Sequence, residues 1–332
     1  MNRAKLSFIR NGAQRFVKLD LELLQQHYHV TDCYLAARKD INPIQTWQQV
    51  KESDCLVCWF ASWHSFLPAL FARVLNKPFI LITGGYDVAN MPEVGYGNQT
   101  YGLKKWISRL GLQLASQLVA FSHFSREEAV RNVGVRREQV EVIYLGIPDT
   151  FGELPCMPRK AIALTVGNVW VENLQRKGHE FFVRAAPRLA KMAFVLAGEC
   201  EPQALAYLKP LASPNVTFTG YLTAPALLEH YRQASVYVQA SLHEGFGLSV
   251  AEAMLAGCIP AVTRAGALPE VVGETGIYLQ DTTPAALAEG IRCAVEIGDE
   301  RHRKQARERI LQAFALERRQ QALYSLIDEL VA

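Results

Sequence analysis

Residues 244–252 read EGFGLSVAE, and residues 253–257 continue the run as AMLAG. Two glutamates bracket a glycine turn, and a helix with periodic apolar residues follows at once. Gly245 and Gly247 let the backbone turn sharply and approach a ligand closely, because neither residue carries a Cβ atom. The helix predicted from Leu248 directs its unpaired N–H groups and the positive end of its dipole toward that turn. The turn is therefore a natural position for a phosphate group.

Glu244 and Glu252 lie on either side of this turn. Glu252 comes one to two turns into the predicted helix, so its carboxylate can accept hydrogen bonds from hydroxyl groups of the same ligand. Glu244 precedes the turn and can do so from the other side. A phosphate flanked by two carboxylates that bind hydroxyl groups describes a nucleotide sugar.

The glycine pair differs from the dinucleotide fingerprint G-x-G-x-x-G. Val250 occupies the place of the third glycine, and the motif follows the fourth predicted strand of its domain rather than the first. NAD binding is therefore disfavoured. The structural alternative is a helix start with a solvated Glu252, but the two glutamates around a close-approach turn favour ligand binding.

The pattern E-G-F-G-x-x-x-x-E resembles the signature of the retaining glycosyltransferases of family 4, the glycosyl transferases group 1. Residues 257–272 (GCIPAVTRAGALPEVV) and 122–125 (SHFS) also resemble this family, and the resemblance is densest from Val140 to Leu279. It implies the GT-B fold, an α/β architecture of two Rossmann-like parallel-sheet domains that face a central cleft.

The resemblance also implies roles for individual residues. Glu244 would lie by the transferred sugar, while Arg176 and Lys177 would neutralise the diphosphate, and these three are the candidate catalytic residues. The family usually has an arginine directly after the glycine that ends the strand before this loop. Asn168 stands there in this chain, so that either Arg176 substitutes for the missing charge or the positive charge of the site is lower. The candidate donor-binding residues are Glu252, Gly245, Phe246, Gly247, Leu248, Ser249 and Tyr221.

Three residues of the first half are candidates for contact with the acceptor or the sugar. Gly12 lies where the family has a pair of glycines, and Arg15 could reach a phosphate from the same segment. Asp87 follows two glycines at a strand end, where open α/β sheets bind ligands. It is equally consistent with an aspartate that caps its own turn. His64 and His123 lie near strand ends, and we expect both to be packed or surface residues.

Bulk properties exclude several classes of protein. A net charge of +3 over 332 residues, without a long basic tract, argues against nucleic-acid binding. No apolar run approaches the roughly 18 residues that span a bilayer, and early cations argue against a signal peptide. We expect a cytoplasmic protein, with peripheral contact at the inner membrane face as a further option.

The seven cysteines include a C-x-x-C formed by Cys55 and Cys58. The pair lies inside an apolar run that we interpret as a buried strand, where thiols behave as small hydrophobic groups. No metal site or redox site is therefore expected there.

Short apolar runs alternate with helical patterns along the whole chain, which is typical of repeated βαβ units. We predict two such domains, residues 1–150 and 151–315, followed by a helix at 316–332. The resemblance implies that the first is the acceptor-side domain, that the second binds the nucleotide-sugar donor, and that the final helix crosses back to the first domain. The Pro- and Gly-rich segment 145–159 would link the domains. The predicted strands are 5–9, 30–36, 55–60, 79–83, 118–121 and 140–144, then 161–166, 193–196, 216–219, 236–239, 259–263 and 276–279.

Residues 101–116 form a predicted amphipathic helix. Leu103, Trp106, Ile107, Leu110 and Leu114 share one face, whereas Lys104, Lys105 and Arg109 share another. Such a helix could rest on an anionic membrane surface. A helix that packs this apolar face on its own sheet has the same pattern, and we favour that interpretation.

The predicted activity is retaining transfer of a sugar from a nucleotide-diphosphate sugar to an acceptor hydroxyl, without a metal and without a cofactor, in glycan or glycolipid biosynthesis. The acceptor could be a glycan, a lipid-linked molecule or a small molecule. One alternative is a catalytically inactive nucleotide-sugar binding protein of the same fold. Glycoside phosphorolysis or nucleotide-sugar epimerisation on this fold is a weaker alternative, since phosphorolysis would usually need lysine-bound pyridoxal phosphate and a longer chain.

Overall fold

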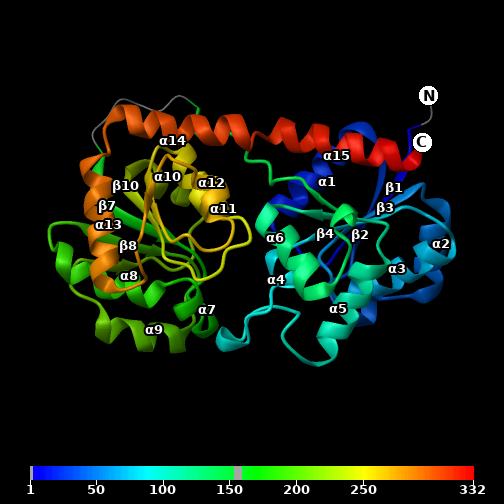
Figure 1. Ribbon diagram of the computed structural model, residues 1–332, viewed down its shortest axis with the longest axis horizontal. Helices are drawn as coiled ribbons and strands as arrows, with labels where there is room; N and C mark the ends of the chain where they lie inside the picture. Colours follow the sequence, from blue (N-terminus) through cyan, green and yellow to red (C-terminus); the bar gives the residue numbers. More distant parts are fainter. Residues whose placement is uncertain (1–2, 153–158) are drawn as a thin grey trace. The chain divides into compact units, whose positions relative to one another are not determined.

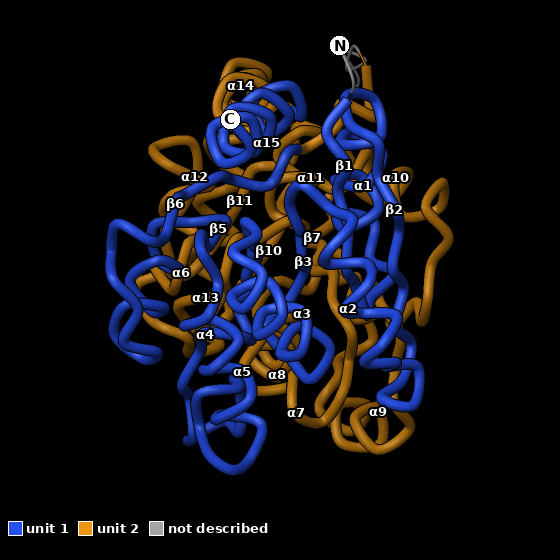
Figure 2. Tube along the Cα trace, turned by 90° about the vertical axis from the view of Figure 1, so that its right-hand side faces the viewer, with its two compact units in different colours: residues 1–146, 316–332 blue, residues 147–315 orange. Residues whose placement is uncertain are grey.

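The computed structural model describes residues 3–152 and 159–332. The chain divides into two compact units. Unit 1 consists of residues 1–146 and 316–332, and unit 2 consists of residues 147–315. Figure 2 colours unit 1 blue and unit 2 orange. The chain passes from one unit to the other at 146–147 and again at 315–316, so unit 1 is built from both ends of the sequence.

Unit 1 contains a six-stranded sheet with the order β2-β1-β3-β4-β5-β6, in which neighbouring strands pair in parallel. The central strands are buried on both faces, as expected of a parallel sheet covered by helices. The strands are β1 (Lys5–Arg10), β2 (His29–Tyr34), β3 (Cys55–Trp59), β4 (Phe79–Thr83), β5 (Gln117–Ala120) and β6 (Val140–Val142). The helices are α1 (Arg15–His27), α2 (Pro43–Glu52), α3 (Trp63–Val74), α4 (Gly85–Val88), α5 (Gly102–Leu114), α6 (His123–Glu128) and α15 (Leu316–Val331), with short segments η1 (Arg38–Asp40), η2 (Pro92–Val94), η3 (Ala129–Val133) and η4 (Arg137–Gln139).

Unit 2 contains a second six-stranded parallel sheet with the order β12-β11-β10-β7-β8-β9 (Figure 1). Its strands are β7 (Lys160–Val166), β8 (Ala193–Ala197), β9 (Val216–Phe218), β10 (Ala234–Gln239), β11 (Ile259–Val262) and β12 (Ile277–Tyr278). Its helices are α7 (Val171–Arg176), α8 (His179–Ala185), α9 (Pro202–Leu208), α10 (Ala224–Gln233), α11 (Leu248–Leu255), α12 (Leu268–Val272), α13 (Pro284–Glu296) and α14 (Glu300–Ala313), with η5 (Ala186–Leu189) and η6 (Lys209–Leu211).

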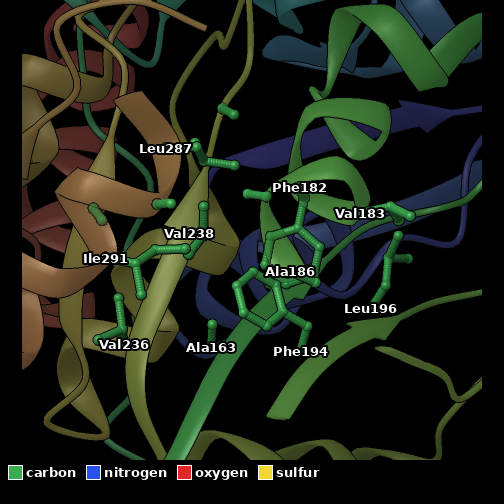
Figure 3. Close-up of a cluster of buried hydrophobic side chains, with 14 of the residues drawn as sticks. Ala163, Phe182, Val183, Ala186, Phe194, Leu196, Val236, Val238, Leu287 and Ile291 are labelled. Carbon is green, nitrogen blue, oxygen red and sulfur yellow. The ribbon is translucent and has the colours of Figure 1, made fainter. Parts of the chain in front are cut away.

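The core of unit 2 lies between its sheet and the helices α8 and α13 (Figure 3). The aromatic rings of Phe182 in α8 and Phe194 in β8 pack with centroids 5.0 Å apart. Val236 and Val238 point into the same cluster because alternate residues of a strand share a face. Tyr237, which lies between them, is also fully buried but belongs to the other face. Helices therefore cover both faces of β10, and this fixes the strand end that leads into the glycine turn.

The twelve predicted strands are confirmed, each within a few residues of its predicted bounds. Helix α14 ends at Ala313 and α15 begins at Leu316, the residue at which the final helix was predicted to start. The predicted linker 145–159 contains the passage from unit 1 to unit 2, but its residues 153–158 lie outside the described part of the chain.

Helix α15 packs in unit 1 through a buried ion pair. Arg319 lies 2.6 Å from Asp20 of α1 through both Nε and Nη2, and the two side chains are 2% and 1% exposed. Trp59 of β3 donates its indole N–H to the same carboxylate. Arg319 also donates to the carbonyl oxygens of Ile143 and Tyr144. One guanidinium thus joins the last helix to α1 and to the segment after β6.

The favoured interpretation of the helix at residues 101–116 was wrong. Helix α5 buries Ser108, Gly111 and Leu112, whereas Leu103 and Trp106 are exposed. The reason is steric. A Cβ on Gly111 would lie 3.2 Å from the Ser65 hydroxyl of α3, so α5 packs closely on its neighbour through its small residues.

The interpretation of the C-x-x-C pair as buried thiols is confirmed. Cys55 and Cys58 are both fully buried in β3 and are free thiols. Burial raises the pKa of Cys55 to about 12 and the pKa of Cys58 well above its usual value. Both therefore stay protonated and act as packing groups.

Candidate functional site

The candidate site lies at the carboxyl edge of the unit 2 sheet, where the strand order reverses. The chain runs outward from β7 through β8 to β9 and then returns to place β10 on the other side of β7. Open α/β sheets bind their ligands outside the carboxyl ends of the strands at such a switch point. The predicted glycine turn follows β10 directly, and the loop with Arg176 and Lys177 belongs to the connection that follows β7.

Gly247 has the left-handed backbone that the turn requires. Its φ of 98° is strained for any residue with a side chain, and it immediately precedes the first residue of α11, Leu248. Phe246 is 3% exposed, and its ring packs edge-on against Phe314 with centroids 5.4 Å apart. Phe246 therefore anchors the turn in unit 2, while the backbone around it forms the start of α11. The hydroxyl of the buried Tyr237 donates to Gln239 Oε1 at 3.0 Å, next to the same strand end.

A second glycine brings the basic loop to the same strand end. Gly178 has φ 72°, and a Cβ there would lie only 2.3 Å from the carbonyl oxygen of Ala240, directly after β10. The backbone N–H of Leu242 donates to the carbonyl of Arg176 at 2.8 Å. The turn at 176–178 is thus held against the end of β10, which explains how residues about 70 positions from the glycine motif reach it.

Lys177 and Glu244 form a largely buried ion pair. Their Nζ and Oε2 atoms are 3.0 Å apart, and the side chains are 18% and 15% exposed. Gln239 and Ser241 also lie 3.4 Å from the same carboxylate oxygen as donors. Burial raises the pKa of Glu244, but the charges of Lys177 and Arg176 more than offset it, so the pKa ends below its usual value. Glu244 is therefore ionised at neutral pH.

Arg176 is 7% exposed and is oriented by a chain of hydrogen bonds that starts at the end of β7. Its Nη2 donates to the side-chain oxygen of Asn173, and the amide nitrogen of Asn173 donates to the carbonyl of Asn168 at 3.1 Å. Asn168 itself is exposed. Asn168, which stands where the family usually has an arginine, thus supports Arg176 indirectly: its backbone carbonyl holds Asn173, and Asn173 holds Arg176. Asn173 was not predicted from the sequence.

Glu252 has a partner that sequence reasoning missed. The hydroxyl of Tyr231 in α10 donates to Glu252 Oε2 at 3.1 Å. Tyr231 is 1% exposed, and burial together with the Glu252 charge raises its pKa well above the usual value, so it remains a donor. Because 21 residues and a strand separate the two, no local sequence signal could have paired them.

His179 lies directly after the basic turn and is buried. Desolvation, together with the neighbouring charges of Lys177 and Arg176, lowers its pKa to about 3, so the ring is neutral. Its Nδ1 has no hydrogen-bond partner among the described residues. A Cβ on Gly167, which ends β7, would lie 3.5 Å from the His179 Nε2 atom and 3.7 Å from Lys177 Cδ. The glycine thus leaves room beside the Lys177 side chain.

Tyr221 lies at the same sheet edge but farther from the ion pair. It is 76% exposed and follows Gly220, directly beyond β9. The N–H of Gly198 donates to the carbonyl of Gly220, and a Cβ on Gly198 would lie 2.1 Å from the Gly167 carbonyl. The loops after β7, β8 and β9 therefore touch one another through glycines.

The three candidates from the first half belong to unit 1, whereas the other candidates belong to unit 2. Gly12 accepts a hydrogen bond from Arg10, and Arg15 is the exposed first residue of α1. Asp87 is 3% exposed, and its carboxylate accepts the N–H of Gly84 at 2.6 Å. Burial raises the pKa of Asp87 to about 7, although backbone hydrogen bonds oppose the shift. Its carboxylate is directed at its own turn.

Of the two histidines, His64 is packed and His123 is exposed, as the sequence predicted. His64 is fully buried with Nε2 at 2.8 Å from the Trp59 carbonyl, and desolvation lowers its pKa to about 4. Within the part of the chain that the structure describes, no helix has both the length and the apolar character needed to cross a bilayer.

Residues 160–296 match the family model described as glycosyl transferases group 1. The match covers less than half of the chain. The group 1 segment includes β7 through α13 and therefore contains the basic loop, the glycine turn and both glutamates.

Known proteins extend the comparison beyond the group 1 segment. An uncharacterized glycosyltransferase of Methanocaldococcus jannaschii, MJ1607, is 27% identical over 201 residues, 53% of this chain and 50% of that protein. The MMP alpha-(1->4)-mannosyltransferase of Mycolicibacterium hassiacum is 28% identical over 193 residues, 57% of this chain and 46% of that protein. The aligned part thus spans about half the length of these curated relatives.

A solved structure matches both units. The crystal structure of Anabaena Alr3699/HepE in complex with UDP and glucose has a TM-score of 0.75 at 16% identity and covers 98% of this chain and 100% of that one. The likeness, with the two six-stranded parallel sheets, confirms the predicted α/β fold class of GT-B type.

Proposed function

We propose that this protein transfers a sugar from a nucleoside diphosphate sugar to an acceptor hydroxyl, with retention at the anomeric carbon, as in family 4. The observation that carries the proposal is the Lys177–Glu244 ion pair, 3.0 Å long, at the switch point of the unit 2 sheet. It places a cation and an ionised carboxylate beside a helix start with a close-approach glycine turn. The group 1 match of residues 160–296 supports this assignment.

The diphosphate would bind between the basic loop and the start of α11. Lys177 offers a compact charge, and Arg176 offers a planar fork of donors suited to phosphate oxygens. The first N–H groups of α11, from Leu248 and Ser249, favour negative charge at the same place. Because these groups are already in position, they stabilise the charge that develops on the leaving diphosphate. We therefore propose that the reaction needs neither a metal nor a cofactor.

Glu244 would bind sugar hydroxyls rather than donate a proton. Its lowered pKa keeps it ionised, so it can only accept hydrogen bonds. In the transfer step the bond from the anomeric carbon to the diphosphate oxygen breaks, and its electron pair leaves with the diphosphate. The acceptor oxygen forms the new bond on the same face, and its proton passes to the departing phosphate oxygen. Lys177, released in part from Glu244, would follow the charge to the diphosphate.

Glu252 would bind the ribose hydroxyls, and Tyr231 would hold its carboxylate in place. The neighbour solved with UDP and glucose, and a relative named as a mannosyltransferase, support a nucleoside diphosphate hexose as donor. We propose a glycan, lipid-linked or small-molecule acceptor in cytoplasmic glycan or glycolipid biosynthesis.

The first test is a thermal-shift screen against UDP, GDP, ADP and their common sugar conjugates without added metal. A ligand that binds only the folded protein raises the melting temperature by mass action. One base should give a clear shift that Glu252→Ala loses, whereas Glu229→Ala, an exposed glutamate of α10, should keep it. Equal shifts in the wild type and Glu252→Ala would refute the assignment of Glu252 to the nucleotide.

The second test separates an enzyme from an inactive binding protein. With the donor identified, release of nucleoside diphosphate is followed with water or a panel of acceptors, and the anomeric configuration of the product is read by NMR. Glu244→Ala should bind the bare nucleotide but release none from the sugar conjugate. A wild-type protein that binds donor yet never turns it over would leave the binding protein as the correct function.

A further inference from the structure

Helix α5 and the residue before it, Tyr101, turn several large apolar side chains outward. Tyr101 is 72% exposed, Leu103 71%, Trp106 61% and Leu110 44%. These four residues, which we call the α5 face, form the densest run of exposed large hydrophobic side chains among the described residues. Isolated exposed leucines are common in soluble proteins, but several large apolar groups on one helix face mark an interaction surface.

Unit 1 cannot cover the α5 face by rotating the helix. The buried side of α5 carries Ser108, Gly111 and Leu112, and it is held by close packing on α3 through the small residue Gly111. Gln99 also donates to the Ser108 hydroxyl at 3.4 Å. The inward side is therefore fixed by steric fit and polar contact, so the apolar side stays at the surface.

The charged side chains of α5 are all positive. Lys104 is exposed, Lys105 and Arg109 are half-buried at its flank, and no residue from 94 to 126 is an aspartate or glutamate. A second copy of this chain would bring like charges together across a symmetric contact, which is unfavourable. An anionic surface with an apolar interior satisfies both the cations and the exposed rings.

We propose that α5 docks unit 1 on the surface of an anionic lipid bilayer. Trp106 and Leu110 would enter the boundary between headgroups and acyl chains, with the helix lying in the plane of the surface. Lys104 and Lys105 would contact lipid phosphates. This proposal does not depend on the proposed transferase activity.

The test is co-sedimentation of the full chain with phosphatidylcholine vesicles that do or do not contain phosphatidylglycerol. Binding should require the anionic lipid and weaken as salt is added. Each surface cation is worth about fivefold in partition, so Lys104→Gln with Lys105→Gln should lower binding by about 25-fold. Trp106 fluorescence should shift to the blue on binding, and Trp106→Phe should remove that change.

A matched pair of variants isolates the apolar contribution. Leu103 and Ile44 are 71% and 72% exposed, and each is the second residue of a unit 1 helix, α5 and α2. Leu103→Ser should lower vesicle binding about tenfold, because a large aliphatic group no longer leaves water, whereas Ile44→Ser should leave it unchanged. Circular dichroism should show both variants folded.

Three results would overturn the proposal. One is absence of binding to anionic vesicles, and another is equal loss of binding in Leu103→Ser and Ile44→Ser. The third is self-association in sedimentation velocity that Leu103→Ser abolishes without any vesicle binding, which would assign the α5 face to a second copy.

Discussion

Replacing Arg319 by methionine should destabilise unit 1 more than any surface change. The guanidinium makes four hydrogen bonds inside unit 1, two to Asp20 and one each to the carbonyls of Ile143 and Tyr144. Methionine fills much of the same volume but donates nothing. The Asp20 carboxylate, which is 1% exposed, would keep the indole N–H of Trp59 as a hydrogen-bond donor.

The magnitude follows from these partners. Removing one member of a buried ion pair costs about 3–5 kcal/mol, because the remaining charge is left without compensation. The two carbonyls that lose a donor add about 1 kcal/mol each unless water reaches them. Since the segment after β6 can relax toward solvent, we expect a loss of about 4 kcal/mol in the stability of unit 1.

Hydrogen exchange followed by mass spectrometry is the suitable assay, because it reports each unit separately. Peptides of β3 should exchange faster in Arg319→Met, while peptides of β10 in unit 2 should be unchanged. The double variant Asp20→Leu/Arg319→Met should recover most of the loss, since an apolar pair removes the buried charge. A loss of stability below about 1 kcal/mol in Arg319→Met, or a double variant no more stable than the single one, would show that the Arg319–Asp20 ion pair does not hold α15 in unit 1.

Three further perturbations test the unit 2 site. Tyr231→Phe should weaken nucleotide binding about tenfold, since a hydrogen bond to a carboxylate is worth about 1.5–3 kcal/mol. The control is Tyr207→Phe: the Tyr207 hydroxyl also donates to a glutamate, but at the surface, so calorimetry should show normal nucleotide binding for this variant. Gly178→Ala combines a left-handed backbone with a clash against a carbonyl and should abolish nucleotide binding or folding. Gly95→Ala has a similar φ of 62° with open space for its Cβ, so a melting curve should show only about 1–2 kcal/mol of strain. The pKa of His179 is lowered to about 3, so between about pH 6.5 and 3 this residue is protonated in the unfolded chain but neutral in the folded chain. Stability should fall with acidification by up to about 1.4 kcal/mol per pH unit from this group, and His179→Asn should flatten that slope in urea titrations; an unchanged slope would contradict the assignment.

The elements that could be predicted are those whose signal is local. Buried parallel strands appear as short apolar runs, which is why strands such as β3 and β10 were predicted within a few residues. The glycine turn before α11 could be recognised because turn, helix start and both glutamates lie within nine consecutive residues.

The remainder depends on contacts between distant residues. The partner of Glu252 lies 21 residues away, and that of Arg319 lies 299 residues away, so neither pair leaves a periodic pattern. The buried side of α5 was predicted wrongly because periodicity finds an apolar face but does not say which face fits the neighbour. Gly111 packs against α3 where a leucine would not fit.

The passage of the chain into unit 2 and back has a consequence for synthesis on the ribosome. Unit 2 is continuous, whereas unit 1 lacks α15 until residues 316–332 are made. At about 5–20 residues per second, translation of residues 147–315 delays α15 by roughly 10–30 s. During that interval Asp20 has no Arg319 to pair with. We therefore expect unit 2 to complete its folding first, although the translation of unit 1 begins earlier.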